Sequence, residues 1–303
     1  MSEPTARDVG EFALIAAVTD RLPTSDAVLL GPGDDAAVVA FPEGRVGATT
    51  DLLVEGVHFR RDWSSAYDVG CKAAAANLAD IAAMGGTATA LLVGLASPPD
   101  LPVSWVLALA DGLRDEAAVV GAVVVGGDTV TAHQIVVAVT ALGSLVGAPV
   151  TRAGARAGDL VVVAGRLGWS AAGLRLLHQG IDAGPLVEAH QRPAPPYALG
   201  PILARAGATA MCDVSDGLVA DLGHLARASG VGIELDASAL GEETSTLEGV
   251  MLEDVLTGGE DHALVATLDG PVPEGCRVIG RVVDGSGVRV NGETVPGGWV
   301  HFS

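Results

Sequence analysis

The spacing of apolar and polar residues divides the chain into alternating helical and extended segments. Apolar positions recur at helical spacing over residues 8–22, and alanine-rich stretches at 66–84 and 104–119 predict two longer helices that end at Gly85 and Gly121. Short apolar runs around these helices predict strands at 28–30, 36–40, 46–50, 88–95, 122–126 and 135–146. The first half therefore predicts a mixed α/β domain.

A second α/β segment follows a break in this pattern. Residues 147–159 read GAPVTRAGARAGD, and such a Gly-, Pro- and Arg-rich stretch is typical of a join between domains. Beyond it, helices are expected at 170–179 and 217–228, and strands at 160–164, 231–235, 263–268, 277–283 and 288–290. We expect an α/β, or α+β, protein of two domains, residues 1–147 and 148–303.

Charge and cysteine content narrow the possible functions. The 303 residues carry 17 basic and 37 acidic side chains, a formal net charge of −20, which disfavours nucleic acid and membrane surfaces as partners. The single lysine, Lys72, stands in VGCKAAA and not in a phosphate-binding GxxxxGK[ST] loop. Three widely spaced cysteines predict neither a disulfide framework nor a four-ligand zinc site, and they suit the cytoplasm. The first residues, MSEPTARDVGEF, lack the apolar stretch of a signal peptide.

Several aspartates stand where an apolar segment meets glycine or a hydroxyl residue, unlike the acids of a solvated helix face. They occur in GPGDDAAVV, TTDLLVEGVHF, NLADIAAMGG, VVVGGDTV and CDVSDGL, at Asp34, Asp51, Asp80, Asp128, Asp213 and Asp216. A single such aspartate is most simply a turn or helix cap, but six similar placements weaken that interpretation.

Convergence of these carboxylates would require cations. Each pair of like charges about 4 Å apart costs on the order of 4 kcal/mol at an effective dielectric of 20. Carboxylate, hydroxyl and carbonyl oxygens favour Mg²⁺, Mn²⁺ or Ca²⁺ over zinc, and magnesium indicates phosphate chemistry.

Fewer signals point to the other ligands. The glycine pairs at 126–127 and 258–259 allow close approach of an anion, although such pairs also mark ordinary turns. Arg152 and Arg156 could grip a phosphate or could be solvated linker charges. His58 lies in a glycine-containing loop after Asp51, and Trp299 could be a core residue or a stacking surface for a heteroaromatic ring.

Taken in order, the motifs resemble the thiamine-monophosphate kinase family, in the superfamily of aminoimidazole ribonucleotide synthetase and selenophosphate synthetase. The resemblance runs from about residue 8 to 303 and also includes TRAGARAGD, GRLGWSAAGL, GGEDHAL and GGWVHF. It implies a two-domain fold, with an N-terminal mixed-sheet domain that pairs in a homodimer and a C-terminal α/β domain over the nucleotide.

The resemblance also implies ATP-dependent phosphorylation of thiamine monophosphate, with several Mg²⁺ ions. By motif position the metal-binding residues would be Asp34, Thr49, Thr50, Asp51, Asp80, Asp128, Asp213 and Asp216. Gly127, Arg152 and Ser215 would contact ATP, and His58, Glu260 and Trp299 would contact the thiamine part. We expect direct in-line transfer without a nucleophile from the protein, assisted by Asp51, Asp128 and Arg152.

The sequence departs from the usual family pattern at three places. His262-Ala263 stands where Tyr-Glu is common, Trp169 where Asp is common, and Pro196 where Arg is frequent. Three alternatives remain open at this point. They are another ATP-dependent reaction of the superfamily, an acidic metal- or ligand-binding protein without turnover, and an acidic globule whose charge serves solubility alone.

Overall fold

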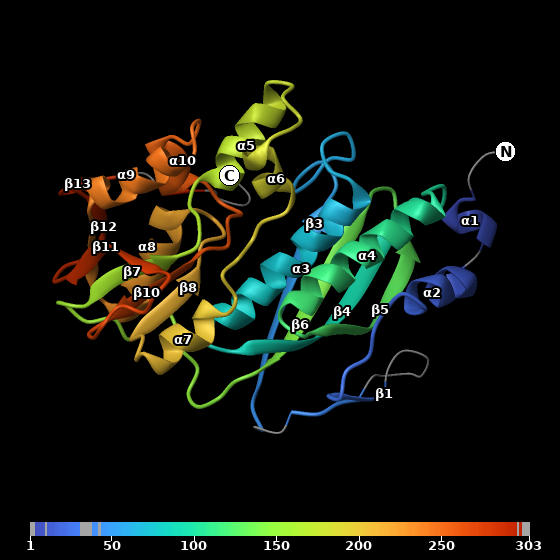
Figure 1. The fold of residues 1–303 in the computed structure, drawn as a ribbon, viewed down its shortest axis with the longest axis horizontal. Helices are drawn as coiled ribbons and strands as arrows, with labels where there is room; N and C mark the ends of the chain where they lie inside the picture. Colours follow the sequence, from blue (N-terminus) through green and yellow to red (C-terminus); the bar gives the residue numbers. More distant parts are fainter. Residues whose placement is uncertain (1–3, 10, 31–37, 42–43, 296, 299–303) are drawn as a thin grey trace. The chain divides into compact units, whose positions relative to one another are not determined.

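The computed structural model describes residues 4–9, 11–30, 38–41, 44–295 and 297–298 (Figure 1). The chain forms two compact units. Unit 1 comprises Met1–Ile81 and Thr87–Leu145, and unit 2 comprises Ala82–Gly86 and Val146–Ser303. Both combine helices with a β-sheet, so the expectation of a mixed α/β protein of two domains is confirmed.

Unit 1 contains a four-stranded sheet in the order β3-β6-β4-β5. Strands β3 and β6 and strands β6 and β4 pair antiparallel, whereas β4 and β5 pair parallel. Its elements are α1 (Ala6–Val9), α2 (Glu11–Thr19), β1 (Val28–Leu30), β2 (Val38–Val39), β3 (Val46–Val54), α3 (Ala66–Ala83), β4 (Thr87–Ser97), α4 (Val103–Val119), β5 (Val123–Thr131) and β6 (Val136–Ser144).

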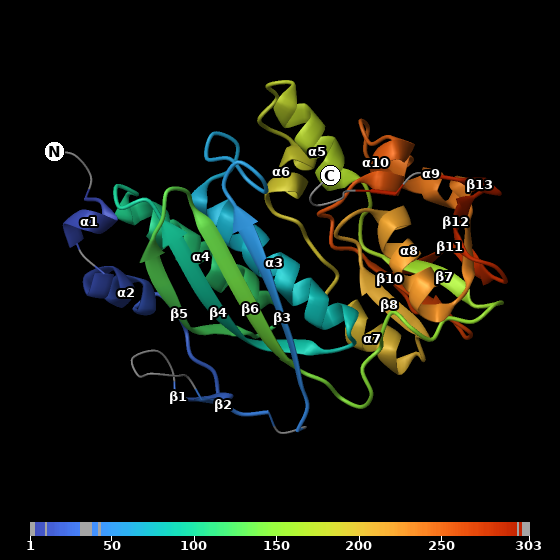
Figure 2. The same cartoon turned by 180° about the vertical axis from the view of Figure 1, so that it is seen from behind.

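The two faces of this sheet differ. Helices α3 and α4 cover one face, and the other faces the viewer in Figure 2. Along β6 every second residue, such as Val137 and Val139, is fully buried under the helices. On the opposite face the side chains of Leu52 and Leu92 are 51% and 37% exposed. We call this second surface the open face.

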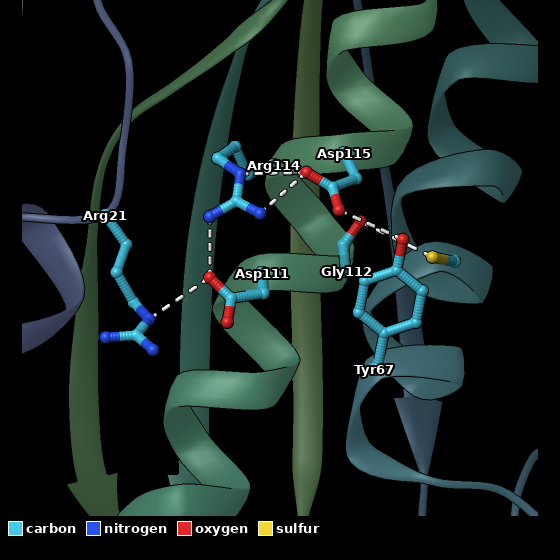
Figure 3. A network of polar contacts seen from close by, with 7 residues as sticks. Arg21, Tyr67, Asp111, Gly112, Arg114 and Asp115 are labelled. Atoms are coloured by element: carbon cyan, nitrogen blue, oxygen red, sulfur yellow. Dashed lines mark hydrogen bonds and ion pairs between the residues drawn. The ribbon is translucent and has the colours of Figure 1, made fainter.

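Helices α3 and α4 approach each other closely because glycines face each other's backbone. A Cβ atom at Gly70 would collide with the Leu109 carbonyl oxygen, and one at Gly112 with the Tyr67 carbonyl oxygen. Tyr67 Oη also donates to Asp115 Oδ2 at 3.0 Å (Figure 3). Burial, together with this bond, raises the pKa of Tyr67 to about 12.

The polar network in Figure 3 continues from Asp115 along α4 to the segment after α2. Arg114 contacts Asp115 at 2.7 Å and Asp111 at 2.6 Å. Asp111 in turn accepts from Arg21 Nε at 3.1 Å. The Arg21–Asp111 pair connects α4 to the segment after α2, whereas the two Arg114 pairs lie within α4. Each of these partly exposed pairs contributes at most about 1 kcal/mol.

Unit 2 contains a seven-stranded sheet in the order β13-β12-β9-β11-β7-β10-β8, in which only the β12–β9 pair is parallel. A core of Val, Leu, Ile and Ala side chains packs between this sheet and helices that include α8. Its elements are β7 (Leu160–Ala164), α5 (Trp169–His178), α6 (Pro185–Gln191), α7 (Leu199–Arg205), β8 (Ala210–Asp213), α8 (Leu218–Ser229), β9 (Gly232–Leu235), α9 (Ala237–Thr246), α10 (Leu252–Thr257), β10 (Leu264–Leu268), β11 (Cys276–Val283), β12 (Gly287–Val290) and β13 (Glu293–Thr294).

Some expected boundaries were wrong. Strands β3 and β5 continue to residues 54 and 131, so Asp51 and Asp128 lie inside strands and do not follow them. Both strands extend through threonines, glycines and an aspartate because the neighbouring strands supply their hydrogen bonds. Among the described residues, no helix is long and apolar enough to cross a membrane.

Candidate functional site

Strand β3 and helix α3 bring three of the expected metal-binding residues together. Thr49 and Asp51 lie on the face of β3 toward the helices, because strand side chains alternate. Thr49 Oγ1 donates to Asp80 Oδ2 of α3 at 2.6 Å. Thr50 points to the open face, where Thr140 Oγ1 donates to its hydroxyl at 3.1 Å.

Asn77 supports this arrangement, although the sequence analysis did not select it. Its side chain is 1% exposed, and its Oδ1 accepts from the backbone N–H of Asp51 at 3.0 Å. Its Nδ2 donates to the Ala73 carbonyl oxygen at 3.0 Å, so both ends of the amide are bonded. The available signal was an asparagine after an alanine run in the helix, one turn before Asp80.

Asp128 stands apart from this group. It lies on β5, is exposed, and is in register with Leu52 across the open face. Strands β3 and β5 are the two edges of the sheet, so three strand spacings of about 4.8 Å separate them by roughly 14 Å. The sheet therefore does not place Asp128 beside Asp51. Gly127 packs so closely on β4 that a Cβ would collide with the Val93 carbonyl oxygen.

His58 occupies a tight turn after β3. Its Nδ1 accepts from the Val54 N–H at 3.1 Å, so in the neutral ring the proton resides on Nε2. The buried Lys72 donates from Nζ to the His58 carbonyl oxygen at 3.2 Å. The lysine therefore holds the backbone of the histidine loop, a role consistent with the absence of a phosphate-binding loop around it.

In unit 2 the CDVSDGL and GGEDHAL motifs lie against each other. The backbone N–H of His262 donates to the Val214 carbonyl oxygen at 3.0 Å, and that of Glu260 to the Ser215 carbonyl oxygen at 2.9 Å. Glu260 and His262 both have positive φ angles, 65° and 52°, a conformation that costs energy without glycine. The pairing of the two loops compensates for this cost.

Two further contacts surround these loops. His262 Nδ1 lies 3.1 Å from Asp213 Oδ2, and both side chains are buried. His262, which stands where Tyr is common in the family, thus places a ring nitrogen beside the Asp213 carboxyl group, which is expected to bind metal. His190 Nδ1 lies 3.0 Å from Ser170 Oγ and 3.6 Å from Glu260 Oε2. A buried histidine therefore stands beside the glutamate expected to contact substrate.

Asp261 connects GGEDHAL to the GRLGWSAAGL motif. Its Oδ2 accepts from the Gly168 N–H at 2.5 Å and its Oδ1 from the Ser170 N–H at 2.8 Å. The carboxylate thus caps the start of α5 from a distant part of the sequence. Burial raises the pKa of Asp261 to about 7, although the two N–H bonds oppose the shift.

Asp221, on α8, is a second buried aspartate that the motif analysis did not select. Burial raises the pKa of its carboxyl group to about 7, and the charge of Asp213 adds to the effect. Asp216 also raises it through its charge. Three carboxyl groups of the CDVSDGL segment and α8 therefore interact electrostatically, which is the situation that a hard cation relieves.

The arginine expected to contact phosphate, Arg152, lies near the end of α8. Arg152 is exposed, and its carbonyl oxygen accepts from Ser229 Oγ at 3.0 Å. Burial raises the pKa of the Cys212 thiol well above its ordinary value, and the positive charge of Arg152 opposes the shift. At the start of α5, the Arg166 guanidinium lies 4.6 Å from the ring centroid of Trp169, the second departure.

The donor chemistry fits a hard divalent cation, because all seven described residues expected to bind metal offer oxygen atoms. In the part of the chain that the structure describes, however, no group of three or more His, Cys, Asp or Glu side chains is arranged to hold a metal by itself. Asp34 and Trp299 lie outside the described residues.

Comparisons with known proteins place these motifs in context. The model of the AIR synthase related protein N-terminal domain matches residues 33–145, and that of the C-terminal domain matches residues 156–293. The chain is 50% identical to the thiamine-monophosphate kinase of Mycobacterium tuberculosis strain H37Rv, over 99% of this chain and 93% of the relative.

Two solved structures are also similar. The thiamine-monophosphate kinase from Stenotrophomonas maltophilia K279a is 35% identical, with a TM-score of 0.80 over 94% of this chain and 98% of that one. AaThiL complexed with AMPPCP and TMP is 35% identical, with a TM-score of 0.79 over 98% of each chain.

Proposed function

Because the chain belongs to the thiamine-monophosphate kinase family of the AIR synthase related proteins, we propose that it phosphorylates thiamine monophosphate. The reaction transfers the γ-phosphoryl group of ATP to the phosphate of thiamine monophosphate and yields ADP and thiamine diphosphate. The observation that carries the proposal is the 50% identity over 99% of the chain. The similar structure of AaThiL was solved with AMPPCP, an ATP analogue, and TMP, which supports these two substrates.

The chemistry of the acceptor explains why the protein needs no general base to activate it. The second pKa of a phosphate monoester is near 6, so at neutral pH the attacking oxygen is already mostly anionic. The protein must instead align two anions and neutralise their charge. We propose direct in-line transfer without a phosphorylated protein intermediate. Arg152 would offset phosphate charge directly, whereas Asp51 and Asp128 would assist by holding the metal.

Magnesium would supply charge neutralisation on the transferring phosphoryl group when bound. The residues proposed to hold it are Asp34, Thr49, Thr50, Asp51, Asp80, Asp128, Asp213 and Asp216. The Thr49–Asp80 bond supports this set, because it orients one carboxylate beside the strand that carries Asp51. The mutual charge effects among Asp213, Asp216 and Asp221 support a second group in unit 2.

The proposed substrate contacts lie mainly in the turn after β3 and in the paired CDVSDGL and GGEDHAL loops. Gly127, Arg152 and Ser215 are proposed to contact ATP, and His58, Glu260 and Trp299 the thiamine part. The Val54 N–H bond to Nδ1 fixes the orientation of the His58 ring, and the paired loops hold Glu260 beside Ser215. We propose that residues 1–147 supply metal and ATP contacts and that residues 148–303 complete the site.

We also propose that the enzyme is a cytoplasmic homodimer that pairs through the open face. The exposed apolar side chains of Val46, Leu52, Leu92 and Val130 support this assembly. Exposed apolar side chains on a sheet face are a common feature of subunit interfaces.

The test incubates purified protein with Mg²⁺, ATP and thiamine monophosphate, with thiamine as a parallel acceptor. We expect ADP and thiamine diphosphate in equal amounts from the monophosphate alone. Asp51→Asn and Asp128→Asn should each lower the rate by at least about 100-fold, the effect of losing a major electrostatic stabiliser. Absence of product from folded, ATP-binding protein would refute the assignment, and a labelled phosphoprotein that passes its label to product would refute direct transfer.

A further inference from the structure

The segment Ser215–Gly217 is built around one buried carboxylate oxygen. Asp221 Oδ2 accepts from the backbone N–H groups of Ser215 at 3.0 Å, Asp216 at 3.0 Å and Gly217 at 3.1 Å. Asp221 is 2% exposed, and its own N–H donates to the Gly217 carbonyl oxygen at 2.9 Å. Three consecutive donors therefore converge on a residue from the first turn of α8.

The surrounding backbone leaves this segment little alternative space. The Ser215 carbonyl oxygen accepts from the Glu260 N–H, and a Cβ at Gly259 would collide with that same oxygen. Gly217 has a φ of 119°, and a Cβ there would lie 2.6 Å from the Thr257 carbonyl oxygen. The GGEDHAL loop and the end of α10 thus enclose the segment on one side, while Asp221 binds its N–H groups.

Asp216 and Asp221 have different positions in this arrangement. Asp216 is half-buried and carries its side chain on the segment itself, as Ser215 does. Asp221 lies beneath, and its Oδ2 is occupied by three backbone donors. A buried acceptor shared by three N–H groups cannot be removed without leaving those groups unsatisfied. The direction in which Ser215 and Asp216 project therefore depends on Asp221.

We propose that Asp221 is a positioning residue for the magnesium–nucleotide complex, because it fixes the backbone from which Ser215 and Asp216 extend. This inference rests on the proposed function, in which Ser215 contacts ATP and Asp216 binds metal. Asp221 acts through these two residues and does not touch the ligands. Its loss should therefore affect nucleotide binding far more than binding of the thiamine part.

The test compares Asp221→Ala and Asp221→Asn with Asp236→Ala as a matched control. Asp236 also caps backbone in unit 2, where its Oδ1 accepts from the Ser238 N–H at 2.8 Å, but it is the N-cap of a different helix, α9. Binding of a non-hydrolysable ATP analogue with Mg²⁺ is measured by calorimetry, and KM for thiamine monophosphate is measured in parallel. Circular dichroism and thermal unfolding establish that each variant is folded.

We expect Asp221→Ala to weaken analogue binding by about tenfold or more, with KM for thiamine monophosphate changed by less than about twofold. Asp221→Asn keeps one neutral acceptor oxygen and should lie between Asp221→Ala and wild type, and it carries the test if the alanine variant does not fold. Asp236→Ala should bind the analogue as wild type does. A purely structural role would lower the active fraction and leave both constants unchanged.

Wild-type analogue binding by a folded Asp221→Asn or Asp221→Ala protein would overturn the positioning role, as would an equal rise in KM for thiamine monophosphate. Failure of the proposed function gives a different result. Wild-type protein would then bind the analogue but form no thiamine diphosphate.

Discussion

At the scale of single residues, the Thr49–Asp80 hydrogen bond offers a direct test of the metal-binding residues expected on β3 and α3. A hydrogen bond to a charged group is worth about 1.5–3 kcal/mol, so Thr49→Val should raise the Mg²⁺ concentration for half-maximal rate by roughly 10-fold or more. The measurement is a Mg²⁺ titration of ADP formation at saturating ATP and thiamine monophosphate. Thr49→Ser retains the hydroxyl and should behave as wild type. A Thr49→Val enzyme with an unchanged Mg²⁺ requirement would contradict the assignment of Asp80.

Asp261 provides a prediction about pH and stability. Burial raises its pKa to about 7 from the ordinary 3.8, so the folded state binds the proton more tightly than the unfolded chain. This contribution to stability is complete below about pH 4 and is lost as the pH rises to about 7 and beyond. The free energy of unfolding should fall across this window, by up to about 4 kcal/mol from this carboxyl group.

Asp261→Asn removes this titrating group. The two proteins are therefore compared by how steeply the free energy of unfolding changes with pH, and not by their absolute stability. Urea unfolding from pH 5 to pH 8 in EDTA should show a smaller decline for the variant than for wild type. Equal slopes for the two proteins would mean that the Asp261 carboxyl group titrates normally.

The site was predictable from the sequence only in part. Motifs identified Asp213, Ser215 and Glu260 as candidates, and the structure brings their two loops into contact. The roles of Asn77 and Asp221 could not be predicted, because they depend on which backbone N–H groups reach each side chain in the folded chain. For Asn77 this group belongs to a distant strand, and for Asp221 the groups belong to the turn before its helix. A buried polar residue in an apolar helix is the signal, but it does not identify the partner.

At the scale of helices and strands, the crossing of α3 and α4 depends on glycine. Gly112→Ala would place a methyl group against the Tyr67 carbonyl oxygen, so we expect a loss of about 2 kcal/mol or more in the free energy of unfolding. Gly223, in α8, is the matched control, because its Cβ would lie 3.6 Å from a flexible Arg227 nitrogen. Gly223→Ala should be neutral or stabilising by up to about 1 kcal/mol. Urea unfolding distinguishes the two, and equal stability would refute the close contact.

The long helices and most strands followed from periodicity, whereas the short helices did not. Helix α6 has seven residues beginning at Pro185, and α10 has six beginning at Leu252, too few for an apolar repeat to be visible. Strand β5 was expected to end before Gly127, since glycine is disfavoured in strands. It continues through Gly127, where close packing on β4 leaves room for glycine only. This contact between strands is not described by the strand propensity of a single residue.

At the scale of the whole molecule, the open face connects the fold to the proposed assembly. Its strands carry exposed Leu52 and Leu92, although the chain bears a net charge of −20 that otherwise favours separation of copies. Burial against another copy in the proposed dimer would explain why so acidic a protein keeps apolar residues exposed on this face. The same face carries Asp128, so assembly and the arrangement of acidic residues are connected.

Leu92→Glu tests this connection, because Leu92 lies on a central strand of the open face. A carboxylate buried without a partner costs several kcal/mol, so the variant should sediment as a monomer while wild type sediments as a dimer. Val119→Glu is the control, since Val119 ends α4 and is 68% exposed. It should remain dimeric with the same far-ultraviolet circular dichroism. A monomeric wild type, or a dimeric Leu92→Glu protein, would show that the open face is not the interface and that its apolar residues need another explanation.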